Sequence, residues 1–123
     1  MTASVQVAGD QVIVDLGGGD PAAGVPADLR IPLASVRAAY ADAELAVNPG
    51  PAVVGRHLPG HLVTGTFRTS GERVLWNVRD PAKSVIIELA EHRYARLIIE
   101  VDDPEATVAL VLDAIRPPAD RHQ

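Results

Sequence analysis

The N-terminal part of the chain alternates between apolar and polar residues with a period of two, which is typical of strands with one buried face. Two alternating segments, 3–8 and 11–16, flank Gly9-Asp10, so the pattern predicts a tight β-hairpin. A segment rich in glycine and proline follows and predicts a loop over residues 17–26. Beyond this loop we expect a short extended segment at 29–31.

Residues 33–47 fit two periodicities equally well. Leu33, Val36 and Tyr40 follow a helical stripe, whereas the residues from Ala39 to Val47 alternate as in a strand. We interpret the segment as one helical turn at 33–37 followed by a strand at 38–46. The prolines and glycines that follow predict a loop that continues to residue 61.

The second half of the chain predicts four strands joined by short turns, at 62–68, 73–79, 84–89 and 94–101. We expect each strand to pair with the next one along the chain. If the residues beside each turn face one another, Trp76 lies on the inward face opposite Ile87. The same register puts Gly65 opposite Trp76, where the absence of a side chain leaves room for the indole ring.

The chain ends with the pattern of an amphipathic helix. The sequence Asp102-Asp103-Pro104-Glu105 combines an N-cap, a first-turn proline and acidic residues at the positive end of the helix dipole. An apolar stripe with helical spacing follows and is expected to face the core: Val108, Val111, Leu112 and Ile115. Two prolines at 117–118 end the predicted helix.

These elements predict a mainly β (α+β) protein: a bent antiparallel seven-stranded sheet or open barrel, capped by one C-terminal amphipathic helix. The chain has 123 residues, of which 47% are hydrophobic. This length and composition suit one globular domain, which we place at 1–118, with a disordered tail at 119–123.

The pattern resembles the bacterial members of the pleckstrin-homology-like (PH-like) superfold. The residues that carry this resemblance are Ile31-Pro32-Leu33, Pro59-Gly60, Gly65-Thr66-Phe67, the strand at 85–89 and the segment 98–105. The resemblance implies a non-catalytic binding module for lipid head groups, peptides or proteins, and several bacterial members resemble oligomer-forming modules. Phosphoinositide binding is not expected, because the first hairpin loop, 8–11, carries one acid and no cation.

Composition narrows the classes of partner. The net charge is −5, which disfavours nucleic acids and anionic membranes as partners. The chain has no cysteine, so disulfides and thiolate metal sites are excluded. No apolar run approaches the length of a membrane span, and no basic and apolar leader opens the sequence. We therefore expect a cytoplasmic protein without an integral membrane segment, and we predict no cofactor.

One face of the predicted sheet is a candidate interface. The assumed register turns three aliphatic residues outward beside an aromatic residue and arginines, a combination that is enriched in protein–protein interfaces. The candidate residues are Leu75, Ile86, Tyr94, Arg96 and Ile98. The alternative is an ordinary solvated sheet face.

A second candidate is the predicted loop that contains Arg56, His57 and His61, which suits a small anion. A helical zinc site at these histidines is disfavoured, because Pro59-Gly60 lies between them. No nucleophile is paired with a base in a known catalytic motif. The leading hypothesis is therefore a binding or scaffold module that acts through protein contacts, including self-association. The alternatives are a binder of small anions or lipid head groups at residues 56–61 and, least favoured, an enzyme.

Overall fold

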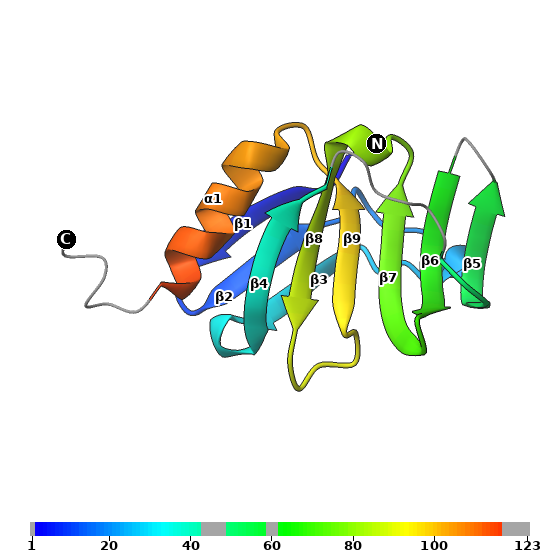
Figure 1. Ribbon diagram of the computed structural model, residues 1–123, viewed down its shortest axis with the longest axis horizontal. Coiled ribbons are helices and arrows are strands. Elements are labelled where there is room, and N and C mark those ends of the chain that lie inside the picture. The colour runs from blue at the N-terminus through cyan, green and yellow to red at the C-terminus, as the bar shows by residue number, and fades with distance from the viewer. Residues whose placement is uncertain (1, 43–48, 59–61, 117–123) are drawn as a thin grey trace.

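The computed structural model describes residues 2–42, 49–58 and 62–116, and the described part is mainly β with one C-terminal helix, as predicted. A small sheet contains, in spatial order, β1 (Ser4–Ala8), β2 (Gln11–Asp15) and β3 (Asp28–Pro32). A large sheet contains β4 (Val36–Ala41), β8 (Ser84–Leu89), β9 (Arg96–Glu100), β7 (Glu72–Val78), β6 (Leu62–Thr69) and β5 (Ala52–Leu58). Figure 1 shows the small sheet behind the half of the large sheet formed by β4, β8 and β9.

The N-terminal hairpin has the predicted register, with Ala8 opposite Gln11 on either side of the turn. β3 adds to β2, and buried residues alternate with more exposed ones along both strands. A 3-10 turn at Leu33–Ser35 then carries the chain from the small sheet to β4 of the large sheet. The predicted helical turn is thus shorter than expected, and the part of the predicted strand at 43–46 lies outside the described residues.

The largest difference from the sequence prediction is the position of β9. This strand lies between β7 and β8, parallel to β7 and antiparallel to β8. The expected β7–β8 hairpin is therefore wrong, and the large sheet is mixed rather than purely antiparallel. The described residues contain nine strands rather than seven, because the short extended segment expected at 29–31 is the full strand β3 and the loop expected before residue 61 contains β5.

The inserted strand also changes which residues share a face. Trp76 on β7 is opposite Ile98 on β9, and Ile98 is opposite Ile86 on β8. Because residues opposite one another point to the same face, Trp76 shares a face with Ile86 and not with the predicted Ile87. Ile87 instead points toward the small sheet, together with Leu97.

The inner core fills the space between the two sheets. Strands of both sheets and the helix contribute aliphatic side chains to it, and the completely buried ones include Val12, Ile31, Val85, Ile99 and Val111. A second set of buried side chains, the outer cluster, lies on the opposite face of the large sheet: Val63, Phe67, Val74, Trp76, Val78, Ile86 and Ile98. The central strands are thus buried on both faces, so their residues are apolar in continuous runs.

Trp76 combines apolar burial with a short chain of polar contacts. Its side chain is 1% exposed, and its indole N–H donates a hydrogen bond to the Thr69 hydroxyl at 2.8 Å. That hydroxyl donates in turn to the carbonyl of Pro49 at 2.7 Å. The contacts satisfy the buried indole donor and attach the start of the 49–58 segment to β6.

The helix α1 (Pro104–Ile115) begins as predicted: Asp103 is the N-cap and its carboxylate accepts from the Ala106 N–H at 3.1 Å. Val111 is completely buried, and Val108 and Ile115 pack against the inner core. Leu112 was expected to be buried but is 40% exposed, because the helix lies mainly against β4 and β1 and presents a narrower apolar face. In Figure 1 the helix crosses the β1 and β4 side of the two sheets.

The start of the described chain contacts the segment between β9 and this helix. The Ala3 N–H donates to the Glu100 carbonyl at 2.7 Å, and Ala3 forms a parallel bridge with Val101. The Thr2 hydroxyl donates to the Asp102 carboxylate at 3.1 Å. These contacts attach the residues just before β1 to the end of β9 and the residues that follow it.

Residues 52–58 form β5, although the sequence analysis placed them in a loop. Gly55 on β5 pairs with Gly65 on β6, and Gly65 pairs with Trp76 as predicted. A side chain at Gly65 would not meet the indole, however. It would meet backbone atoms of Val54 and Gly55 and, at 2.7 Å, the carbonyl oxygen of Ala23. Glycine is needed here because the 3-10 turn η1 (Pro21–Ala23) packs closely against the two strands.

We expect Gly65→Ala to lower the free energy of unfolding by about 1–3 kcal/mol, because the new methyl group overpacks against backbone that cannot move independently. Urea denaturation measures this loss. Gly9→Ala is the control: Gly9 also has a positive φ, 62° against 131° at Gly65, but a methyl group there meets nothing within 4 Å. Equal losses in the two variants would contradict the steric explanation.

We expect Thr69→Val to lower the free energy of unfolding by about 1–3 kcal/mol, because it leaves the buried indole N–H of Trp76 without an acceptor. Thr69→Ser keeps the hydroxyl and should lose less stability. In the Trp76→Phe background, which has no N–H donor, Thr69→Val should cost less than in the wild type. Equal costs in the two backgrounds would show that the hydrogen bond contributes nothing.

Candidate functional site

The predicted interface on the large sheet does not exist as an exposed surface. Leu75, Ile86, Tyr94 and Ile98 are at most 5% exposed. They also lie on different faces: Leu75 and Tyr94 belong to the inner core, whereas Ile86 and Ile98 belong to the outer cluster. The prediction was wrong because it placed β8 beside β7, and insertion of β9 shifts the faces of β8 and β9 relative to β7 by one residue.

Arg96 and Tyr94 have structural partners instead. The Arg96 guanidinium forms a 3.0 Å salt bridge with the Glu72 carboxylate, which joins β9 to the start of β7. The Tyr94 ring stacks on His92, with ring centroids 5.9 Å apart, and the Arg93 guanidinium lies 5.1 Å from the Tyr94 centroid. These contacts order the connection between β8 and β9.

The predicted anion-binding loop is a strand in its described part. Arg56 and His57 are exposed consecutive residues of β5, so their side chains point to opposite faces of the sheet. They do not converge on a shared anion, and His61 lies outside the described residues. The prediction of a loop at 55–58 was wrong because the prolines and glycines lie around the strand, and Gly55 is accommodated opposite Gly65.

The structure exposes aliphatic side chains along β5, which the sequence analysis placed in a loop. Six of the seven residues of this strand are exposed, and its aliphatic side chains Val53, Val54 and Leu58 are 47%, 39% and 53% exposed. β5 is the last strand of the large sheet, and no described strand pairs with its outer edge. We call this surface, residues 52–58, the β5 edge.

The two edges of the large sheet differ in how they are protected. At the opposite edge, α1 packs against β4, and the Tyr40 hydroxyl donates to the Glu88 carboxylate at 2.7 Å. At the β5 edge the described protection is a bulge between Ala52 and Val54 and the charge of Arg56. The β5 edge is therefore the candidate site of interaction.

Other site types find less support in the described ranges. Within residues 2–42, 49–58 and 62–116, no three histidine or acidic side chains come together in a way that could hold a metal ion. The one helix found in those ranges is too short to cross a membrane. Comparison with protein-family models, with curated proteins and with the solved structures found no match to this chain.

Titration of His92 makes stability depend on pH. Burial lowers the pKa of His92 below its usual 6.5, and the charge of Arg93 lowers that pKa further. The folded protein thus binds a proton less readily at His92 than the unfolded chain does, so folding is stabilised above pH 6.5 and this contribution is lost as the pH falls through the lowered pKa.

We expect urea denaturation to show a smaller loss of stability between neutral pH and about pH 5 in His92→Gln than in the wild type, since the variant lacks the titrating group. His57→Gln is the control, because His57 is an exposed residue of β5. Parallel pH profiles of the wild type and His92→Gln would contradict the predicted linkage.

Proposed function

We propose that this chain is a non-catalytic binding module that makes its protein contacts by strand addition at the β5 edge, with a second copy of the chain as the partner. The observation that carries the proposal is the exposure of three aliphatic side chains along a seven-residue edge strand. The PH-like resemblance of the sequence agrees with a binding role.

Strand addition would satisfy two groups of unfavourably exposed atoms at once. An edge strand presents a row of backbone N–H and C=O groups that can pair with another extended segment. The apolar side chains beside that row gain free energy when a partner removes them from water. A partner strand at the β5 edge would therefore bury Val53, Val54 and Leu58 in part and continue the large sheet.

A second copy fits the side chains of this edge. Antiparallel pairing centred on Gly55 would place Val54 opposite Arg56 of the second copy, just beyond the bulge between Ala52 and Val54. This register keeps the two copies of Arg56 from facing each other directly, and like charges in direct opposition would be unfavourable. The contact is self-complementary, as a two-fold dimer requires.

We expect light scattering to give the mass of two chains for the wild type and of one chain for Val53→Lys. The new cation removes apolar area from the contact and adds to the positive charge of Arg56, while the 47% exposure of Val53 allows the variant to keep its fold. A melting curve checks that the fold is retained.

Leu112→Lys is the matched control, because Leu112 is a similarly exposed aliphatic residue on α1 and should leave the dimer intact. A wild type that stays monomeric at high concentration overturns self-pairing and leaves a foreign segment as the occupant of the edge. A dimer that persists in Val53→Lys but dissociates in Leu112→Lys would place the interface on the helix.

A further inference from the structure

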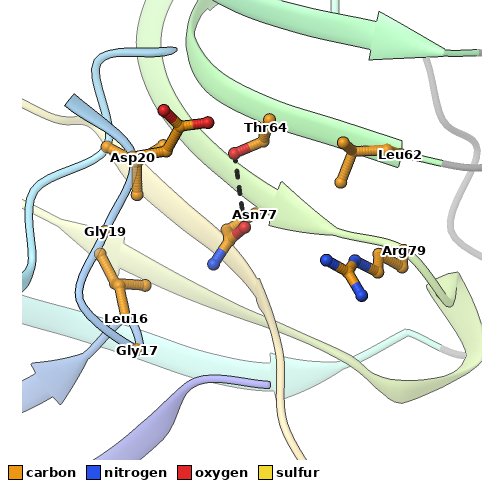
Figure 2. Close-up of a pocket in the computed structure, with 9 residues that line it drawn as sticks. Leu16, Gly17, Gly19, Asp20, Leu62, Thr64, Asn77 and Arg79 are labelled. Atoms are coloured by element: carbon orange, nitrogen blue, oxygen red, sulfur yellow. Dashed lines mark hydrogen bonds between the residues drawn. The ribbon is translucent and has the colours of Figure 1, made fainter. Parts of the chain in front are cut away.

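A polar pocket of about 200 Å³ lies between the loop after β2 and the strands β6 and β7. Its lining includes glycines and polar residues, which are labelled in Figure 2: Gly17, Gly19, Asp20, Thr64, Asn77 and Arg79. None of these residues belongs to the β5 edge, so the pocket is a separate feature from the proposed dimer contact.

The polar character of this pocket interrupts the inner core. Leu75 precedes Asn77 on the same face of β7 and is completely buried in that core. At Asn77, and at Thr64 opposite it on β6, the same face becomes polar. The small sheet lies over the half of the large sheet formed by β4, β8 and β9. Residues of the 17–26 loop cover the part formed by β6 and β7.

The floor of the pocket offers hydrogen-bond donors. Thr64 is only 6% exposed, and its hydroxyl donates to the amide oxygen of Asn77 at 3.4 Å. The amide nitrogen of Asn77, which lines the pocket, points away from Thr64 in Figure 2. It donates to no protein atom in the described ranges, so its two N–H groups are available to a bound acceptor.

Arg79 adds a positive charge at one side. Its backbone N–H and that of Asp80 both donate to the Glu100 carboxylate at 2.8 Å, which fixes the end of β7. The Arg79 guanidinium forms no ion pair with any described residue, and Figure 2 shows it directed toward Asn77. Together these two side chains suit a carboxylate, which accepts hydrogen bonds from both.

Asp20 supplies a negative charge at the other side of the Thr64–Asn77 pair. Its backbone is held firmly, because its N–H donates to the Val25 carbonyl at 2.8 Å and its carbonyl accepts from Val25 and Ala23. The Asp20 carboxylate forms no ion pair within the described part of the chain. It therefore suits an ammonium group and disfavours a ligand that carries only negative charge.

Gly17 and Gly19 of the glycine run at 17–19 line the pocket. All three glycines have positive φ values, between 67° and 88°. A side chain at Gly19 would also meet the carbonyl oxygens of Val25 and Pro26 at 2.5 Å. The run that appeared in the sequence as a plain loop is therefore a wall of this pocket.

We propose that the pocket binds a small zwitterion with the chemistry of a free amino acid. Its carboxylate would contact Arg79 and the Asn77 amide, and its ammonium group would contact Asp20. The volume lies below the roughly 300–1,000 Å³ of sites for drug-sized ligands, so the ligand is small. This inference concerns a second site and goes beyond the proposed protein contact.

The test is a titration of the ¹⁵N-labelled full chain with glycine, followed by two-dimensional NMR. We expect saturable shifts of the amide signals of Gly17, Gly19 and Asn77. Arg79→Gln and Asp20→Asn should each weaken binding about tenfold or more, because each removes one charged contact. Arg73→Gln and Asp28→Asn, which change exposed charges outside the pocket, should leave the affinity unchanged.

Acetate and phosphate carry only negative charge, and methylammonium carries only positive charge. Their affinities therefore test whether the pocket uses both Arg79 and Asp20. Each should bind at least about tenfold more weakly than glycine if both charges are used. Phosphate or acetate binding as tightly as glycine would identify an anion site and overturn the proposal. The absence of saturable shifts with glycine, alanine and serine at millimolar concentrations would overturn it as well, as would shifts confined to residues outside the pocket.

Discussion

The arrangement of the large sheet depends on β9, which pairs along both of its edges. It is antiparallel to β8 on one side and parallel to β7 on the other, so it is the strand that joins two otherwise separate groups of strands. Its side chains point alternately to the two faces of the sheet: Leu97 and Ile99 belong to the inner core, and Ile98 belongs to the outer cluster. Val101, directly after it, bridges to the small sheet, and the helix begins three residues later.

Features that depend on neighbouring residues could be predicted from the sequence. The first hairpin, the β6–β7 register and the Asp103 cap each result from residues close together in the chain, and each has the predicted form. The neighbours of β9 could not be predicted in this way. Asp80-Pro81 correctly indicates a change of direction, but it does not determine whether β7 and β8 then lie side by side. The continuous apolar runs of β8 and β9 are typical of strands that are buried on both faces. The sequence analysis assumed one inward face and one outward face for each strand, so it did not use this signal.

The candidate sites could be predicted less well than the fold. The apolar interface of the sequence analysis lay on strands that proved central, and the β5 edge lay in a segment whose glycine suggested a loop. A signal for β5 was present in the consecutive valines at 53–54. The polar pocket has no sequence signature, because Asp20 and Arg79 line the same pocket only after the 17–26 loop packs beside β6 and β7. The PH-like relationship itself stays a prediction from sequence.

The bridge between Ala3 and the Glu100–Val101 segment affects how the chain is made as well as how it is held together. During synthesis, the N-terminal hairpin leaves the ribosome long before its partner near residue 100 exists. At roughly 5–20 residues per second, that delay lasts about 5–20 s. The first hairpin, with Val12 and Val14, can pack against earlier core residues during this interval, but not against Ile99, Val101 or Val111. The contacts between Ala3 and the end of β9 are therefore among the last to become possible as the chain is made.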